Sequence, residues 1–505
     1  MRRRLTPLIL LLLACEAGPA STATATVELD PNGTTPLAAL LAVSTVEPST
    51  LSIAVTGPDD AWTVQVDDAD TEHEVAILGL TPNGTFQVVV TASGQDGSNE
   101  LPQLSFNTGP LPQPFPEIVV EASIPESMEP GLTMFDVGET AAYLVVIDQE
   151  GRVVWLYVPP DAAVGDVRLL PNGNLLYLSG SDIYEMTMLG DIVRHIEASE
   201  GDLRFHHEVF PTAEGTYLTL GFEISEVDDF HTSEVDSEPL ATVDVTDDAI
   251  LEVETDGTVV RRHNLLDILD PSRIGYDSLS DHFRLETPND WAHANAIISD
   301  GDSVIVSVRH QDAVFKARRD TGELAWILAP HDNWSSAFQP YLLEPSGIGF
   351  AWSYHQHAPQ LTSDGTLLLF DNGNHRASPY DGQVPMTPEE SYSRAVEYRI
   401  DEDNMTVEQV WEYGAELDPQ LYASFVSDAD HMPSTGNVLI NFGGLRGLGG
   451  ETNEAMGRGR LQSRLREVQR GSTDRIVFDV SIYSDLDDSG DGFRSYRSER
   501  IPSFH

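Results

Sequence analysis

One pattern recurs along most of this 505-residue chain: a polar residue, a short strand, a turn with glycine, and an apolar strand. The copies are VRLLPNGNLLYLS, HHEVFPTAEGTYLTL, HANAIISDGDSVIVS, HAPQLTSDGTLLLF and DADHMPSTGNVLI. A repeated unit of this kind buries its apolar face only against its neighbours. The repeat, with a closing pair of strands, predicts an all-β fold, a six-bladed β-propeller over residues 119–505. Long insertions break the strict period, so stacked sandwiches are the structural alternative.

Residues 24–110 predict a separate, small β-sandwich ahead of the repeat. Short alternating runs such as LSIAVTG, WTVQVDD and TFQVVVTAS are separated by Gly, Pro, Asn and Asp turns. ILGLTPNGTFQVVVTA resembles the late hairpin of a fibronectin III/Ig-like domain. PLPQPFPEI then has the composition of a semi-rigid linker to the repeat.

The charge of the chain excludes one class of partner. The formal net charge is −54. Binding a nucleic-acid backbone needs a basic face, so no nucleic acid is expected as a partner. Lysine occurs once, as Lys316, so a phosphate loop with a Gly-Lys pair is absent and any Schiff-base chemistry would have to use that residue. No cofactor is predicted.

The first residues, MRRRLTPLILLLLAC, combine three arginines with a short apolar run. The run is too short to span a bilayer and predicts a signal peptide within residues 1–20. LLAC resembles a bacterial lipobox, in which Cys15 becomes lipidated, and an ordinary signal peptide cut near AGPA is the alternative. We therefore expect a protein exported across the inner membrane, periplasmic or anchored to the outer membrane. Cys15 is the only cysteine, which excludes an intrachain disulfide and a cysteine zinc site.

Three histidines occupy the same position in the repeat. His207, His293 and His357 each lie eight residues before the glycine of their turn. The fourth copy has Asp428 at this offset, with Ser427 beside it. Equivalent positions in different blades form a ring around a propeller axis. The register therefore predicts one shared polar pocket built from distant parts of the chain.

Two kinds of chemistry fit a pocket of histidines. Neutral imidazoles bind Zn, Cu or Fe, and they also attack electron-poor sulfur or phosphorus. Arg309 and Arg376 each follow one strand after a pocket histidine. A guanidinium repels a metal cation but fits an oxyanion through paired N–H donors. The arrangement favours an anion site without a metal, although spacing alone leaves both open.

The chain resembles the bacterial arylsulfate sulfotransferases. The matching segments include HHEVF, DWAHANAI, SVRHQDAVFKARRDTGELAWIL, QHAPQLTSDG, LLLFDNGNHR and the terminal SYRSERIP, within residues 130–505. The resemblance implies a six-bladed propeller behind a smaller β domain. It also implies transfer of a sulfuryl group from a phenolic sulfate donor to a phenolic acceptor, with ping-pong kinetics and without a nucleotide donor.

The catalytic roles come from this resemblance. His357, the histidine of QHAP, would be the nucleophile that is transiently sulfated. His293 and Arg309 would line the sulfuryl site. Of the HH pair, the register favours His207 as the additional catalytic histidine.

The remaining candidates would bind the substrate: Asn295, Ser427, Arg376 and His206. Ser427 is a loose match to the family's hydroxyl residue, and Arg376 would either bind the donor's anion or pair with an acid. Many relatives carry Asp after the QH motif, where this chain has Ala358. Its departures from the family affect the acceptor range more than the core chemistry.

Three functional classes follow. The first is a sulfotransferase that touches the membrane only through a lipid anchor, with a homodimer as one possible assembly. The second is a propeller lipoprotein that binds or scaffolds without turnover. The third is a metal-dependent hydrolase or sulfatase that uses the same histidines.

Overall fold

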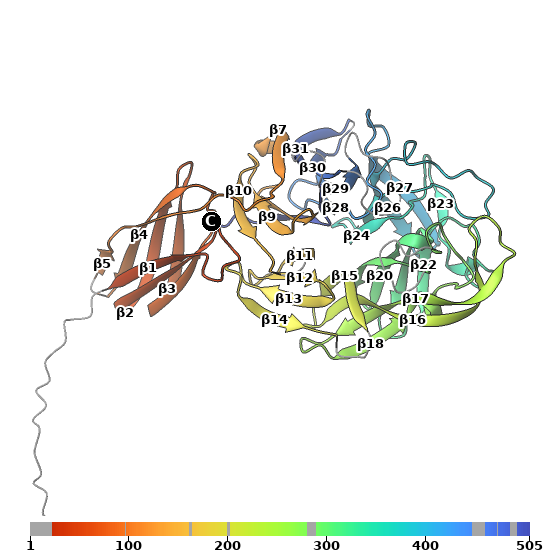
Figure 1. Ribbon diagram of the computed structural model, residues 1–505, viewed down its shortest axis with the longest axis horizontal. Helices are drawn as coiled ribbons and strands as arrows, with labels where there is room; N and C mark the ends of the chain where they lie inside the picture. Colours follow the sequence, from red (N-terminus) through yellow and green to blue (C-terminus); the bar gives the residue numbers. More distant parts are fainter. Residues whose placement is uncertain are drawn as a thin grey trace, which may run out of the picture.

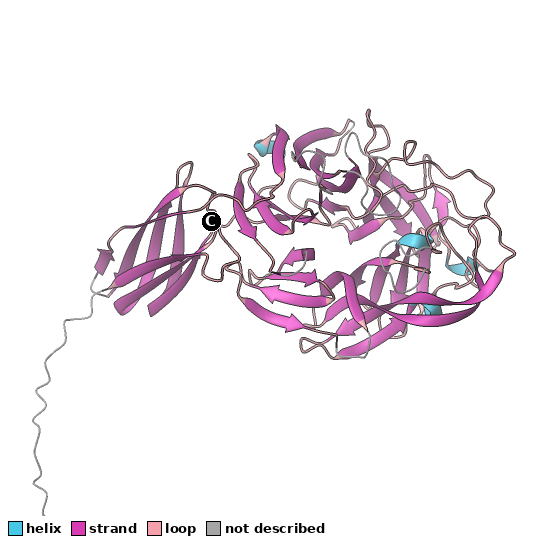
Figure 2. Cartoon of the chain, viewed as in Figure 1, coloured by secondary structure: helices cyan, strands magenta, loops and turns pink. Residues whose placement is uncertain are grey.

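The computed structural model describes residues 23–95, 97–160, 164–198, 203–279, 289–446, 460–471, 473–484 and 492–505. The expected signal peptide and Cys15 lie outside these ranges. Strands dominate the described chain (Figure 2). The helical elements are short: η1 (Pro125–Ser127), α1 (Leu265–Ile268), η2 (Arg309–Gln311) and η3 (Gln339–Tyr341).

The N-terminal part is a β-sandwich that the long strand β2 ties together. Its strands are β1 (Thr24–Leu29), β2 (Ala39–Thr56), β3 (Ala61–Ile77), β4 (Thr85–Gly94), β5 (Gly97–Glu100) and β6 (Leu104–Asn107). The first half of β2 pairs with β1 and its second half with β4, while β3 accompanies both halves. The register shifts between Ser44 and Ser49, where β2 passes from one layer to the other. Alternate residues such as Leu41, Val43 and Ile53 are buried between the layers.

Six further sheets follow among the described residues, each of four or five strands (Figure 1). In chain order the first three contain β8 (Leu132–Glu139), β9 (Tyr143–Ile147), β10 (Val153–Tyr157), β32 (Phe493–Arg494) and β33 (Ser498–Ile501); β11 (Val164–Leu169), β12 (Leu175–Ser179), β13 (Asp182–Met186) and β14 (Ile192–Ile196); and β15 (Arg204–Pro211), β16 (Tyr217–His231), β17 (Leu240–Val253) and β18 (Val259–Asn264).

The last three sheets contain β19 (Ala294–Asp300), β20 (Ser303–Val308), β21 (Ala313–Arg318) and β22 (Leu324–Leu328); β23 (Glu344–Ser346), β24 (His357–Leu361), β25 (Leu367–Asp371), β26 (Arg394–Asp401) and β27 (Thr406–Tyr413); and β28 (Asp428–His431), β29 (Val438–Arg446), β30 (Leu461–Gln469), β31 (Arg475–Tyr483) and β7 (Glu117–Ser123). The all-β class, the sandwich and the propeller are as the sequence predicts. We interpret each of these sheets as one blade.

Both ends of the propeller segment close the ring. Strand β7, at the start of the propeller segment, pairs with β31 of the last sheet. Strand β33, at the end of the propeller segment, pairs with β8 of the first sheet. Strands from the two ends of the segment thus complete the last and the first sheet.

The first strands of successive sheets lie side by side around the centre: β11 contacts β15, β15 contacts β19, β19 contacts β24, and β24 contacts β28. Four of them shift register near their start, at Gly165/Arg168, His206/Val209, Ala294/Ala296 and His357/Gln360. A bulge re-aims side chains at the rim of a sheet. These bulges lie where the sequence pattern places its histidines.

The sandwich and the propeller meet at the C-terminus (Figure 1). The terminal His505 ring stacks on Trp62 of the sandwich, with 4.8 Å between centroids. One hydrophobic cluster contains Ile53 and Val90 of the sandwich together with Phe135 and Val480 of the propeller. Within the described ranges, no helix is both long enough and apolar enough to span a membrane.

Candidate active site

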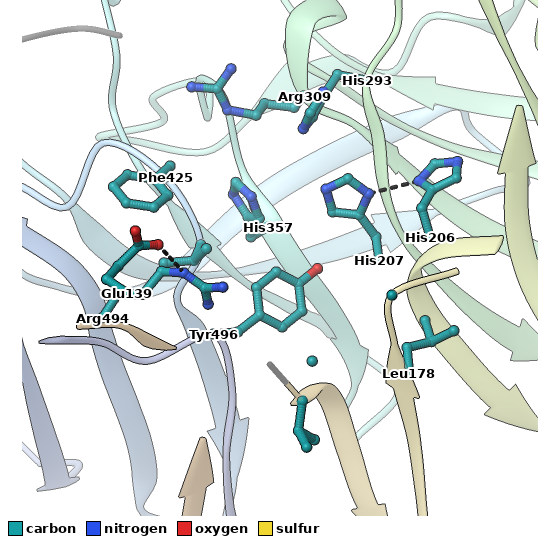
Figure 3. Close-up of a pocket in the computed structure, with 14 residues that line it drawn as sticks. Glu139, Leu178, His206, His207, His293, Arg309, His357, Phe425, Arg494 and Tyr496 are labelled. Atoms are coloured by element: carbon teal, nitrogen blue, oxygen red, sulfur yellow. Dashed lines mark hydrogen bonds and ion pairs between the residues drawn. The ribbon is translucent and has the colours of Figure 1, made fainter. Parts of the chain in front are cut away.

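A cavity of about 380 Å³ lies against the starts of the inner strands. Its polar wall contains His206, His207, His293, His357 and Arg309, and its apolar wall is mainly Val164, Leu178, Phe425, Val426 and Tyr496 (Figure 3). The three histidines that share a register therefore share one cavity. The second sheet has Gly165 at the equivalent position, eight residues before Gly173, and this residue also lines the cavity. Because glycine has no side chain, no group from that position fills the cavity.

His357 is held in one tautomer. Its Nδ1–H donates to Asn372 Oδ1 at 2.7 Å. Asn372 cannot turn its amide, because its Nδ2 donates to the carbonyls of Ala423 at 2.7 Å and Val426 at 3.1 Å. The lone pair of His357 is consequently on Nε2. Burial, and after it the Arg309 cation, lower the pKa of His357 well below its ordinary value, so the ring is neutral.

His293 forms a buried pair with Asp290. Its Nδ1 lies 2.6 Å from Asp290 Oδ2. Both residues are at most 3% exposed. A carboxylate on Nδ1 orients an imidazole and stabilises its protonated form. His293 is therefore suited to exchange a proton at its Nε2.

His206 and His207 form a second pair. Their Nδ1 atoms lie 2.7 Å apart, so one of the two nitrogens carries the proton of this bond. His206 Nε2 lies 3.3 Å from Asp248 Oδ1, which supports a proton on that nitrogen. The His207 backbone has a φ of 62°, and its ring lies 4.8 Å from that of His293. The cavity thus contains two imidazoles in contact, His293 with a carboxylate on its own ring and His207 with a carboxylate on the ring of its partner His206.

Arg309 is the buried cation of the cavity. It is 3% exposed, begins η2 at the end of β20, and donates through Nη2 to the Ser424 carbonyl at 3.2 Å. Its Nη1 lies 3.8 Å from Asp277 Oδ2. Burial lowers its pKa, but a guanidinium remains charged. A fixed guanidinium beside an imidazole lone pair suits an anion with electron-poor sulfur or phosphorus.

Three predicted substrate residues do not line the cavity. Asn295 donates through Nδ2 to the Gln356 carbonyl at 2.8 Å and supports the backbone beside His357. Ser427 Oγ accepts from the Gly443 N–H at 2.9 Å, while its neighbours Phe425 and Val426 provide the wall.

Arg376 is the third of these residues, and the structure gives it the second role that the sequence allows, pairing with an acid. Its Nη1 lies 3.0 Å from Asp371 Oδ2, and its guanidinium covers the Tyr392 ring at 4.0 Å. His206, by contrast, lines the cavity as predicted.

Two donor sets near the cavity have the composition of a cation site: the partly exposed Asp277 and His375 with the buried His355, and the buried Asp290, His293 and His310. In the first set, Arg309 Nη1 lies 3.8 Å from the Asp277 oxygen that faces both imidazoles. In the second, His293 and Asp290 already share a hydrogen bond. The adjacent guanidinium opposes a metal ion at the first set.

Sequence reasoning missed the residues that hold the pocket. Asn372 lies within LLLFDNGNHR and Asp290 begins DWAHAN, so the motifs contained them, but nothing in spacing shows that they bond to the rings. Tyr496 comes from the C-terminal SYRSERIP and reaches the cavity because β33 closes the first sheet. His355 is buried, with Asp312 and Asp277 on its two nitrogens.

Comparisons with known proteins identify a family for both parts of the chain. The model of the family described as Arylsulfotransferase (ASST) matches residues 117–494, and that of the Arylsulfotransferase Ig-like domain matches residues 26–109. "Arylsulfate sulfotransferase AssT" of Escherichia coli O6:H1 is 30% identical over 372 residues, covering 62% of this chain and 59% of that protein. The protein of the same name from Lelliottia amnigena is 29% identical over 373 residues, with the same shares.

The chain thus spans 59% of the length of these curated relatives. A solved structure titled as a putative TolB from Agrobacterium tumefaciens has 14% identity and a TM-score of 0.34, covering 74% of this chain and 99% of that one.

Proposed function

The chain belongs to the arylsulfotransferase family, and on that premise we propose that it transfers a sulfuryl group from a phenolic sulfate ester to a phenolic acceptor. His357 is the nucleophile, a sulfohistidine is the intermediate, and no nucleotide donor takes part. The observation that carries the proposal is the bond from His357 Nδ1–H to an Asn372 that cannot turn. It leaves a neutral Nε2 lone pair as the attacking atom.

The first half-reaction joins this lone pair to sulfur. His357 Nε2 forms the N–S bond while the S–O bond to the aryl group breaks, and the phenolate takes the electron pair. Negative charge then lies on the sulfuryl oxygens and on the leaving oxygen. Arg309 offers fixed N–H donors to the sulfuryl oxygens in a largely buried cavity.

The second half-reaction reverses these roles. An incoming phenol attacks sulfur, the N–S bond breaks, and the electron pair returns to His357 Nε2. The phenolic proton must go to a base, and His207 or His293, each with a carboxylate behind its ring or its partner's ring, can accept it. Phe425, Val426 and Leu178 provide an apolar wall for the aryl groups.

We also propose that the protein is exported and anchored by a lipid at Cys15, in the periplasm or at the outer membrane. The proposal rests on the apolar run and the LLAC motif of the first residues. Labelling with a radioactive fatty acid in a bacterial host tests it. Label in the wild-type chain and none in a Cys15→Ser variant is the expected result.

Turnover of 4-nitrophenyl sulfate, with and without phenol, tests the proposed activity. Release of nitrophenolate that requires phenol, together with formation of phenyl sulfate, is the expected result. Release without phenol would indicate a hydrolase. No release from a folded protein, across several donors and acceptors, would favour the binding or scaffold class. Metal analysis of the same sample checks the hydrolase separately.

A further inference from the structure

A row of five imidazole rings begins in the cavity and leaves it. The ring centroids of His207, His293, His310, His355 and His375 lie in succession 4.8, 4.7, 5.9 and 5.5 Å apart. Only the first two of these rings line the cavity. The proposed transfer chemistry does not use the other three rings, those of His310, His355 and His375. This outer part of the row therefore needs another explanation.

His310 is a costly residue for a purely structural position. It is 0% exposed, and its Nδ1–H donates to the Asp290 carbonyl at 2.5 Å. Its Nε2 is buried and has no hydrogen-bond partner in the part of the chain that the structure describes. Burying a polar atom without a partner costs roughly 1–3 kcal/mol, and an apolar ring would fill the space without that cost. A lone pair on a ring that is stacked on His293 can, however, accept a proton.

The far end of the row reaches Asp277. One oxygen of this carboxylate, Oδ2, lies 3.2 Å from His355 Nε2 and 3.8 Å from His375 Nε2. His355 itself is fixed by Asp312 on Nδ1 at 2.8 Å. The side chains of Asp277 and His375 are 16% and 15% exposed. The row therefore connects the interior of the cavity to groups that meet solvent.

The proposed reaction releases a proton in a way that depends on the donor. When the leaving group departs as the neutral phenol, it takes a proton from the cavity. The proton given up by the acceptor phenol replaces this proton, so no net proton is released per turnover. When a strongly acidic phenol such as 4-nitrophenol leaves as the phenolate, one proton per turnover must leave the cavity. Aryl groups packed against Leu178, Phe425 and Val426 leave less room for water in the cavity.

We propose that His310, His355 and His375, with Asp277, carry protons between the cavity and solvent. This inference rests on the proposed sulfotransferase function. The acceptor phenol gives its proton to His293, the proton moves to His310 Nε2, and from there it reaches Asp277 and the partly exposed His375. The centroids of neighbouring rings lie 4.7, 5.9 and 5.5 Å apart along this path, so each step of the relay is short.

The charges around the row favour this direction. His310 faces His293, Asp290, Arg309 and Asp277, and burial with His293 lowers its pKa well below the ordinary value. It therefore holds a proton only in passing. Burial opposes the charge of His355, but the carboxylates outweigh burial together with the nearby Arg309 cation and raise its pKa. Glu234, on the β16–β17 hairpin, adds negative charge near His375 and Asp277.

Rescue of a His375→Ala variant by imidazole tests the row. With 4-nitrophenyl sulfate and phenol in dilute non-imidazole buffer, we expect kcat to fall about tenfold or more. Added imidazole should restore it in a saturable manner, because His375 is partly exposed. With phenyl sulfate as donor and naphthol as acceptor, the variant should match the wild type, since the leaving phenol takes a proton.

Two further variants make the result decisive. His310→Gln should show the same dependence on the donor without rescue, because its site is sealed. His195→Ala removes an imidazole of 39% side-chain exposure in β14 and should change neither donor's rate. Equal losses on both donors without rescue would mean that Asp277 and its histidines only position Arg309, and no loss would also overturn the row. A wild type that never needs phenol contradicts the proposed function instead.

Discussion

The same inner strands build two chemically opposite surfaces. One is the cavity with its imidazoles, and the other is a second cavity of about 590 Å³ that contains Asp166, Glu208, Asp428, Asp430 and Glu499. Neighbours in sequence face different sides: His207 lines the first cavity and Glu208 the second, as do Tyr496 and Arg497. Alternate side chains of a strand point to opposite sides of its sheet, which separates neighbouring residues. The bulges at the strand starts further change the direction of the side chains there.

The polar side chains of the two cavities differ in their hydrogen-bond and ion-pair partners. Glu208 lies between Arg168 at 2.5 Å and Arg497 at 2.9 Å. Asp428 accepts from the Ser498 N–H at 2.9 Å, and Asp430 from Gln360 at 3.0 Å. Each of these acids therefore has a partner. In the first cavity the bonds instead hold the Nδ1 side of His357 and His293, and Nε2 remains for chemistry. The imidazole side should thus govern rate, and the carboxylate side stability.

The largest expected effect is on the imidazole side. In His357→Gln, transfer between phenols should fall by more than about 10³-fold, because the group that forms the covalent intermediate is gone. The Gln side chain has an N–H that can reach Asn372, so the unfolding midpoint should stay close to that of the wild type. The assay is phenol-dependent turnover of 4-nitrophenyl sulfate beside urea unfolding. Retained transfer in this variant would refute His357 as the nucleophile.

The next effect belongs to the carboxylate side. Arg497→Met should lower the free energy of unfolding by about 3–5 kcal/mol, because it leaves Glu208 without one of its two buried cations. Any protein that remains folded should retain its kcat. Arg399→Met is the matched control, since its pair with Glu408 is 60% and 47% exposed and contributes about 0–1 kcal/mol. Similar losses in both variants would remove the contrast between a buried cluster and a surface pair.

The carboxylate side also predicts an unusual dependence of stability on pH. Burial raises the pKa of Glu499 to about 7, and that of Asp430 to about 6. The folded protein therefore keeps protons that the unfolded chain releases near its ordinary pKa of about 4.3. Stability should be greatest near the lower end of this range and decline as the pH rises towards 7.

Thermal unfolding between pH 4.5 and pH 8 checks this decline. Glu499→Gln should flatten it, whereas Gln in place of Glu323, which is exposed, should not. A midpoint that rises steadily over this range would contradict the direction predicted from these carboxylates.

The repeat pattern made much of this arrangement predictable. Three histidines at one offset from a turn glycine identified residues that share a cavity, because equivalent positions in packed repeats converge. The pattern could not show which side of a strand each polar residue faces. Asn295 and Ser427 follow the register closely but lie behind the wall. The bulge at Ala294/Ala296 turns Asn295 towards the Gln356 carbonyl, and Ser427 Oγ accepts from the Gly443 N–H.

Partners that come from other strands and loops were also beyond the sequence. Asn372 reaches His357 from β25's end, and Asp277 reaches His355 from 78 residues away. Such contacts depend on how loops cross the face of the ring. Arg376 follows His357 by one strand, which allowed either a substrate contact or a pair with an acid, and the structure has the pair with Asp371.

The smallest expected effect lies at the boundary between the two sides. Ala358 follows His357 but lines the second cavity, with a φ of 53°. A left-handed backbone costs a residue with a Cβ about 1–2 kcal/mol, and glycine avoids this cost while losing about 0.5–1 kcal/mol of conformational entropy. Ala358→Gly should therefore be neutral or stabilising by up to about 1 kcal/mol.

Ala395→Gly, in the buried strand β26, has no such strain to relieve and should be destabilising by a similar amount. Urea unfolding of both variants compares the signs. Because Ala358 faces away from the imidazoles, kcat of the first variant should stay within about twofold of the wild type. A large loss of rate without a loss of stability would show that the two cavities are coupled through the backbone of His357 and Ala358. The bulge at His357/Gln360, rather than the imidazole ring alone, would then set the position of His357 Nε2.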